Sequence, residues 1–433
     1  MIKKIILQLE NITPPKYQWI FSHQGFFRYF KNTGWMLLGQ AMSLIVSFFV
    51  GVWLARYLGP SHYGVVNYTI AFVGLFGMIA NLGIDHILQR ELVKYPEKKE
   101  ELLGTAFYLK LIGAFLAILF ILIISFIIKF DPLHRLYIIL FSVSFIFQSL
   151  NVITSWFQSQ VMAKKNVLAN VFALILSAIL KVLFILFKLD LFYLILIYTL
   201  DTLWISLALF YIYKKNGFIL KKWSFNKLLA KSLFYDSWPL ILAGTASFIY
   251  MRIDQVMIGH FKDEAAVGIY AAAIKFGEVW YFLPTLICAS LFPAIINARQ
   301  SNFLVYKQRL KNLIILMALL ALFIAIPTAL LAPFIIPLLF GLEYIASISI
   351  LQIYIWSGIG LFVGIALSQY LIAENLTKKL FVLNLLAMIL NISLNFILIP
   401  RLGIAGAAIT TLVSFLFLPL YMLFEYMFKK RKV

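Results

Sequence analysis

Seven side chains that could do chemistry lie inside stretches that are otherwise apolar. They are Lys181, Asp201, Arg252, Asp254, Lys275, Glu278 and Trp280. An ionised group at the centre of a membrane-spanning helix costs at least about 2.5–3.5 kcal/mol, so each charge there needs a partner or a function. Buried cations can bind phosphate, arginine through a planar fork and lysine as a point charge. Buried carboxylates can hold and release a proton or a metal cation.

These chemistries divide the seven residues into two predicted groups. We predict that a bound anion is contacted by Arg252, Lys275 and Lys181, with Trp280 stacked on a sugar. We predict that ion coupling, to H⁺ or Na⁺, is the role of Asp254, Glu278 and Asp201. The sequence predicts no catalytic residue, no bound metal site and no organic cofactor.

Mutual neutralisation is the alternative for most of these charges. Lys275 and Glu278 are three residues apart and can face each other on one helix. Lys181 could pair with Asp201 within the first half of the chain. Either pair would then be structural and would leave no charge free for a ligand.

Arg252 and Asp254 need partners on other helices. They are two residues apart, which is roughly 200° around a helix, so they point in different directions. Arg252 could reach Asp201 or Asp85, and Asp254 could reach Lys275. Sequence spacing leaves these alternatives open.

The composition places these residues in a membrane protein. Hydrophobic residues make up 63% of the 433 residues and charged residues 12%, against about 45–50% and 25% in soluble domains. The formal charge of +20 could indicate nucleic-acid binding, but basic cytoplasmic loops explain it without a nucleic-acid partner. The single cysteine, Cys288, excludes an internal disulfide and a cysteine-cluster metal site.

Hydropathy predicts an all-α fold with twelve transmembrane helices. A span needs about 20 mostly apolar residues, and such runs occur at 34–55, 66–84, 104–128, 136–161, 167–187, 191–213, 238–259, 267–296, 313–336, 346–371, 380–399 and 404–428. The span at 267–296 contains Pro284 and Pro293, which predict that it bends and acts as a hinge. The prolines concentrate in the second half, which we expect to bend more than the first.

Basic residues predict that both termini are cytoplasmic. With the N-terminus inside, the expected cytoplasmic segments hold 27 Lys and Arg and the outer loops hold 6. This asymmetry requires an even number of spans. The protein is therefore predicted to be a multi-pass protein of a cytoplasmic membrane.

A basic segment at 214–237 divides the chain into two halves. The predicted organisation is an N-terminal interfacial segment 1–33, with a short helix at 17–31, two six-helix lobes and a basic tail; the remaining parts are 34–213, 214–237, 238–428 and 429–433. Aligning Gly64 with Gly268, at an offset of 204 residues, starts a span on each side. We interpret this as a duplication of one bundle, an arrangement that transporters use to place a substrate between halves.

Four stretches resemble one known family. They are LARYLGPSHYGVVNYTIAFVGLFGMIANLGIDHILQRELV (54–93), RIDQVMIGHFKDEAAVGIYAAAIKFGEVWYFLPTLICASLFPAI (252–295), SQYLIAENLTKK (368–379) and LNISLNFILIPRLGIAGAAITTLVS (390–414). They are similar to the polysaccharide-transport (Wzx-type flippase) family of the multidrug/oligosaccharidyl-lipid/polysaccharide exporter superfamily. The resemblance touches both halves of the chain.

The resemblance implies two six-helix lobes around a central cavity. It also implies transfer of an undecaprenyl-pyrophosphate-linked oligosaccharide, such as an O-antigen, capsule or exopolysaccharide unit, to the outer leaflet of a bacterial inner membrane. A polysaccharide polymerase and a chain-length regulator are the expected protein partners. One departure is that the first-lobe spans carry no dense ring of arginine and lysine.

Two other readings remain open. The sequence contains no P-loop and no common hydrolase or metalloprotease motif, and its loops are too short for a catalytic domain, so we expect a transporter and not an enzyme. A cation-coupled multidrug exporter or a lipid II flippase of the same superfamily is the alternative. A cation exporter should have an acidic cavity and a pyrophosphate flippase a basic one, but predicted spans hold four charges of each sign.

Overall fold

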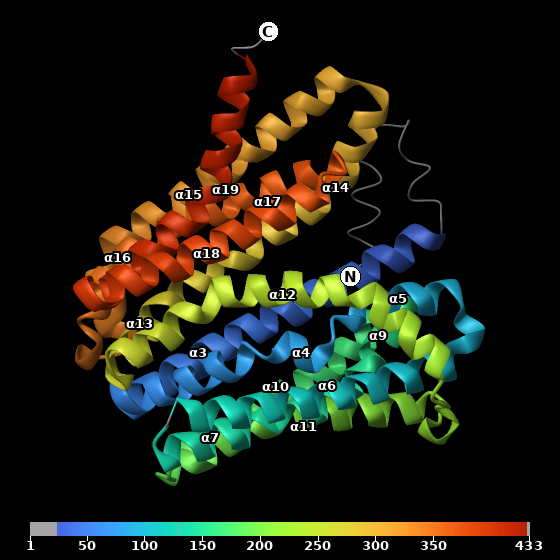
Figure 1. Cartoon of the computed structure of the whole chain (residues 1–433), viewed down its shortest axis with the longest axis horizontal. Coiled ribbons are helices and arrows are strands. Elements are labelled where there is room, and N and C mark those ends of the chain that lie inside the picture. Colours follow the sequence, from blue (N-terminus) through green and yellow to red (C-terminus); the bar gives the residue numbers. More distant parts are fainter. Residues whose placement is uncertain (1–23, 129, 431–433) are drawn as a thin grey trace.

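The computed structural model describes residues 24–128 and 130–430, which are helical and contain no β-strand (Figure 1). The first half comprises α3 (Gln24–Gly74), α4 (Gly77–Asn81), α5 (Ile84–Lys94), α6 (Lys99–Ile127), α7 (Pro132–Ser142), α8 (Ser144–Gln148), α9 (Val152–Ser159), α10 (Ala163–Leu186) and α11 (Leu191–Lys215). The second half comprises α12 (Lys227–Phe261), α13 (Glu264–Glu278), α14 (Phe282–Ser301), α15 (Phe303–Leu339), α16 (Ser347–Tyr354), α17 (Ser357–Ala373), α18 (Thr377–Leu402) and α19 (Ile404–Lys430). The all-α prediction is confirmed.

Ten helices in the described ranges are long and apolar enough to cross a membrane. The difference from twelve has two sources. The stretch Lys31–Gly74, two helices joined at a kink, is counted once and contains the predicted span 34–55 and part of 66–84. The helix α12, which carries Arg252 and Asp254, is not among the ten. The count of twelve and the cytoplasmic position of the termini stay predictions.

The predicted loop between the first two spans is a kink inside α3. Gly59 has φ 69° and ψ 173°, and Pro60 follows it. Glycine adopts positive φ without a side-chain clash, and proline cannot donate the next helical hydrogen bond. The chain therefore leaves the helical conformation at Gly59 and enters a second helical stretch without a longer loop. The predicted interfacial helix 17–31 lies partly outside the described residues, and its described part from Gln24 continues into α3.

The predicted span 267–296 is interrupted close to Pro284. A 3₁₀ turn at Val279–Tyr281 separates α13 from α14. Pro284 cannot donate to the carbonyl of Trp280, four residues earlier, and its ring crowds that carbonyl. The predicted span 267–296 is therefore interrupted one turn before Pro284, while its bending and its role as a hinge stay predictions.

Two helical bundles stack against each other, with α12 between them (Figure 1). One bundle contains α3–α11 and the other α13–α19. The turns predicted to face the cytoplasm, such as those at 85–103 and 214–237, lie at the right-hand end of the view, whereas α7, α13 and α16 mark the opposite end. Successive long helices therefore run between these two ends in alternating directions, and the side that faces the cytoplasm stays a prediction.

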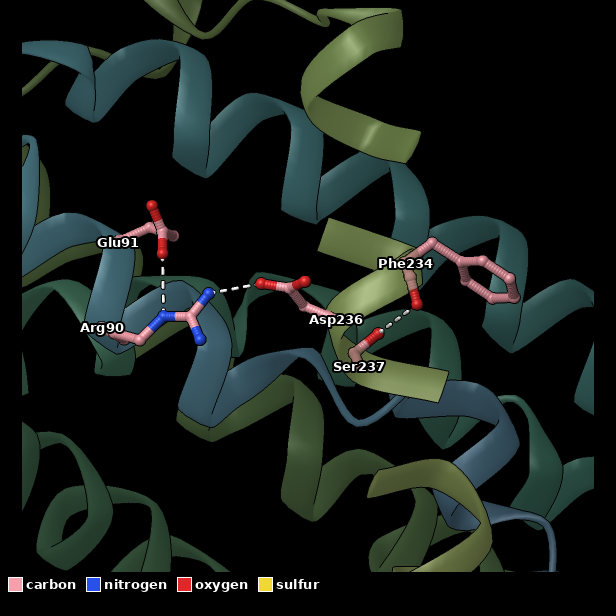
Figure 2. A network of polar contacts seen from close by, with 5 residues as sticks. All are labelled: Arg90, Glu91, Phe234, Asp236 and Ser237. Carbon is pink, nitrogen blue, oxygen red and sulfur yellow. Dashed lines mark hydrogen bonds and ion pairs between the residues drawn. The ribbon is translucent and has the colours of Figure 1, made fainter. Parts of the chain in front are cut away.

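An ion pair joins the first half of α12 to α5 of the first bundle. Arg90 of α5 donates to Asp236 of α12 and, at 2.8 Å, to the neighbouring Glu91 (Figure 2). These hydrogen bonds raise the pKa of the Arg90 guanidinium. The pair is largely exposed, so it sets an orientation more than it stabilises the fold.

The most extensive helix contact is between α3 and α13. A Cβ on Gly64 would lie 1.7 Å from the carbonyl oxygen of Glu264, and a Cβ on Gly268 would lie 1.9 Å from that of Pro60. Pro60 and Glu264 are separated by the same 204 residues as Gly64 and Gly268. Such a reciprocal contact is what a twofold relation between equivalent segments produces. It supports the interpretation of a duplicated bundle.

This crossing predicts a large effect of a small substitution. We expect Gly268→Ala to destabilise the protein by about 1–3 kcal/mol, because the added methyl group meets backbone that cannot move aside. The measurement is thermal unfolding of the purified protein in lipid nanodiscs. Gly358→Ala is the matched control, since nothing lies within 4 Å of its Cβ position. Equal melting temperatures for the two variants would contradict the close crossing.

Candidate functional site

A cavity of about 350 Å³ opens among α3, α10 and α11 of the first bundle. Its polar lining is Ser43, Ser47, Asn170, Ser177, Lys181, Tyr198, Asp201 and Lys275. Seven of these belong to the first bundle, whereas Lys275 comes from α13 of the second. The structure therefore brings together three residues that the sequence singled out, Lys181, Asp201 and Lys275.

Lys181 and Asp201 form an ion pair inside this cavity. The Lys181 ammonium lies 2.8 Å from Oδ2 of Asp201 and 4.0 Å from the centre of the Tyr198 ring, in a cation–π contact. The other carboxylate oxygen, Oδ1 of Asp201, is buried and has no hydrogen-bond partner among the described residues. The pairing that the sequence offered as an alternative is formed, and both side chains still face the cavity.

Lys275 has no carboxylate partner within 4.0 Å among the described residues. Its ammonium lies against the backbone at Gly51, and Tyr63 and Tyr198 are its polar neighbours. The pair with Glu278 that the three-residue spacing allowed is not formed. Lys275 therefore brings a positive charge into the cavity that no carboxylate of residues 24–128 or 130–430 neutralises.

The cavity carries a net positive charge. Two ammonium groups face one carboxylate, and hydroxyl and amide groups surround them. Ammonium groups and hydroxyl donors together suit a phosphate-like anion. The arrangement can bind an anion in the first bundle, with one ammonium group contributed by the second.

Arg252 and Glu278 form a separate ion pair outside this cavity lining. Their side chains meet at 3.0 Å and are half-buried, and they join α12 to the end of α13. Arg252 thus reaches neither Asp201 nor Asp85, the partners that sequence spacing left open. The described geometry gives Arg252 a carboxylate partner, in contrast to Lys275.

Asp254 lies in the interior of the second bundle. It is 3% exposed, accepts a hydrogen bond from the Tyr270 hydroxyl and another from its neighbour's backbone, and lies 3.5 Å from the Thr411 hydroxyl. It does not meet Lys275. A carboxylate so buried and held only by neutral donors is a place where a small cation could bind.

The helices beside Asp254 carry further buried polar groups. Asn391 and Asn395 of α18 bond to each other at 3.0 Å. Atoms without a hydrogen-bond partner in the described part of the chain include Nδ2 of Asn391, Oδ1 of Asn395, and the hydroxyls of Thr410 and Ser414. Unpartnered polar atoms in a protein interior are costly and point to an unmet ligand or water.

Trp280 lies apart from both sites. It lines a small gap with Tyr281, Tyr354 and Phe362 within the second bundle, and its indole nitrogen has no partner among the described residues. The predicted stacking of Trp280 on a sugar in the cavity therefore has no support from its position in this conformation.

Sequence reasoning missed Gly51, Tyr198 and Asn170. A signal for part of the site was available, because Asn170, Ser177 and Lys181 recur at helical spacing along one face of α10. Ser43, Ser47 and Gly51 follow each other at four-residue intervals on α3 in the same way. Polar residues at helical spacing inside an apolar run mark the face that lines a cavity.

Comparison with known proteins fits this geometry. The family model described as polysaccharide biosynthesis protein matches residues 29–299, and the MatE model matches residues 239–397. A curated relative from Haloferax volcanii, "Probable low-salt glycan biosynthesis flippase Agl15", is 26% identical over 200 residues, which cover 45% of this chain and 41% of the relative. The matched segment thus spans less than half the length of that relative.

Two solved structures share the fold. An inward-facing multidrug resistance MATE family transporter of the MOP superfamily has a TM-score of 0.73 at 16% identity, covering 89% of this chain and 94% of the other. The lipid II flippase MurJ in an inward closed conformation has a TM-score of 0.71 at 18% identity, covering 90% and 87%. The resemblance inferred from the four sequence stretches is confirmed: the chain belongs to the polysaccharide biosynthesis protein family, the polysaccharide-transport branch of this exporter superfamily.

Proposed function

We propose that this protein is a flippase that moves an oligosaccharide linked to undecaprenyl pyrophosphate from the inner to the outer leaflet of a cytoplasmic membrane. The observation that carries the proposal is the cavity of the first bundle, where Lys181 and the Lys275 ammonium from the second bundle outnumber Asp201. A pyrophosphate headgroup is the anion that a lipid-linked sugar would present there. The family match to polysaccharide biosynthesis favours a polysaccharide repeat unit, such as an O-antigen or capsule unit, as the glycan.

The charge of the cavity also bears on the alternatives. An exporter of cationic drugs needs an acidic cavity, and this one is basic. A lipid II flippase would carry the same kind of headgroup, so the cavity favours pyrophosphate lipids over drugs without selecting the glycan. In this role the protein would supply units to a polysaccharide polymerase and a chain-length regulator.

Alternating access is the mechanism we propose. The bundles are in closest contact through α3 and α13, and α12 also packs against α3–α6 of the first bundle. A change in the α3–α13 contact would expose the headgroup to the opposite face. The bend at Val279–Tyr281 lies between α13, which holds Lys275, and α14. It is the position where the second bundle can flex without moving the first.

We propose that Asp254 is the residue that couples transport to H⁺ or Na⁺. Its carboxylate is buried among hydroxyl and amide groups and has no basic partner within 4.0 Å in the described ranges. Glu278 is less suited because it forms an ion pair with Arg252. Asp201 is less suited because it forms an ion pair with Lys181. Of the three predicted coupling residues, Asp254 is the one we retain.

A reconstituted flipping assay tests the proposed function. We expect proteoliposomes to move a fluorescent polyprenyl-diphosphate saccharide between leaflets at least about 10-fold faster than protein-free vesicles, because two ammonium groups bind its headgroup. Fluorescent phosphatidylcholine and the cationic dye ethidium are the comparison substrates. Transport of ethidium without flipping of the diphosphate lipid would replace this proposal with drug export.

A further inference from the structure

Lys275 enters the cavity of the first bundle beside Gly51, a residue of α3 that has no side chain. A Cβ on Gly51 would lie 2.0 Å from the Lys275 Nζ atom and 2.5 Å from its Cε atom. Atoms cannot approach so closely, so any other residue at position 51 would push the ammonium away. Gly51 is itself part of the cavity lining.

We propose that Gly51 is a positioning residue of the anion site, because it admits the Lys275 ammonium of one bundle into the cavity of the other. The complete site then exists only while α13 is packed on α3. This inference rests on the proposed function and adds to it a residue and a release step. Gly51 acts through Lys275 and does not itself need to touch the lipid headgroup.

The insertion of Lys275 departs from the twofold relation between the bundles. The offset that pairs Gly64 with Gly268 places Ala71 at the position equivalent to Lys275, and Gln255 at that equivalent to Gly51. Ala71 is a small, buried residue. A lysine that reaches across the contact is therefore carried by the second bundle, and the equivalent residue of the first bundle is an alanine. If position 275 only had to pack against α3, a small residue such as its equivalent Ala71 would be sufficient.

State dependence follows from which bundle carries each charge. Lys181 and Asp201 belong to the first bundle and neutralise each other, whereas Lys275 belongs to the second. If α13 moves away from α3, the cavity keeps a neutral pair and loses its uncompensated ammonium. Affinity for an anion then falls when the contact between the bundles opens, which favours release of the headgroup on the newly exposed side.

Gly51→Ala tests this inference without removing a charge. The added methyl group meets the flexible end of a lysine and not backbone, so the ammonium should move while the fold is kept. We expect binding of farnesyl diphosphate to the variant in nanodiscs, measured by calorimetry, to weaken by about 10-fold. Gly34→Ala, on the same helix with nothing within 4 Å of its Cβ position, should bind like the wild type.

A double-mutant cycle separates positioning from a general packing effect. In a Lys275→Ala background, Gly51→Ala should cause no further loss, because there is no ammonium left to displace. Equal losses in both backgrounds, or wild-type binding by Gly51→Ala, would overturn the inference while leaving the flippase proposal in place. If the wild type itself binds no farnesyl diphosphate, the headgroup site and the proposed function both fail.

Discussion

Replacing Lys275 with alanine is expected to slow flipping of a polyprenyl-diphosphate saccharide by about 10- to 100-fold. A hydrogen bond to a charged group contributes about 1.5–3 kcal/mol, and a factor of ten corresponds to 1.4 kcal/mol. Lys275 is the cation in the cavity that no carboxylate neutralises among the described residues. Its loss leaves the neutral Lys181–Asp201 pair, so the headgroup loses most of its electrostatic attraction. The measurement is the initial flipping rate in proteoliposomes.

Lys214→Ala is the matched control, because this lysine is exposed at the end of α11 and does not line the cavity. It should flip at the wild-type rate. Lys275→Gln adds a second comparison, since it keeps length and polarity without charge. A wild-type rate for Lys275→Ala, with correctly folded protein, would remove this residue from substrate binding.

Replacing Asp254 with asparagine is expected to abolish stimulation of flipping by an ion gradient. Asparagine has nearly the same shape and can still accept from the Tyr270 hydroxyl, but it carries no charge to attract Na⁺ and cannot release a proton in the same way. The measurement compares flipping with and without an imposed Na⁺ or H⁺ gradient. We expect the stimulation, about 10-fold or more in a coupled transporter, to fall to about onefold.

Glu278→Gln serves as the comparison for Asp254→Asn. It neutralises a carboxylate of α13, whose partner is Arg252 at 3.0 Å. It should lower stability through the unpaired Arg252, while gradient stimulation per folded molecule persists. Retained stimulation in Asp254→Asn and lost stimulation in Glu278→Gln would move the coupling site to Glu278.

The fold and the positions of the turns were predictable because they depend on long apolar runs and on the distribution of basic residues. The Lys181–Asp201 pair was also predictable, since both residues lie well inside adjacent spans. The interruption of the helix in 267–296 followed from Pro284. Each of these properties depends on a short stretch of sequence or on the number of basic residues in the loops.

Pairings across helices were not predictable, because they depend on how each helix is rotated about its axis. Arg252 pairs with Glu278, although the spacing of Lys275 and Glu278 allowed a pair on the same helix. The rotation that turns Glu278 toward α12 also turns Lys275 toward Gly51 of α3. A glycine has no side chain, so its role in admitting a lysine becomes visible only when the second helix is in place.

The central claim is that the cavity opens alternately to the two faces of the membrane. Thiol labelling of one residue tests this claim most directly. Ser47 lines the cavity, and the only native cysteine, Cys288, can be replaced by serine. In such a background, Ser47→Cys should react with a membrane-impermeant maleimide from the inner face and, during turnover, from the outer face, and farnesyl diphosphate should protect it from both. Labelling from a single face under all conditions would contradict alternating access.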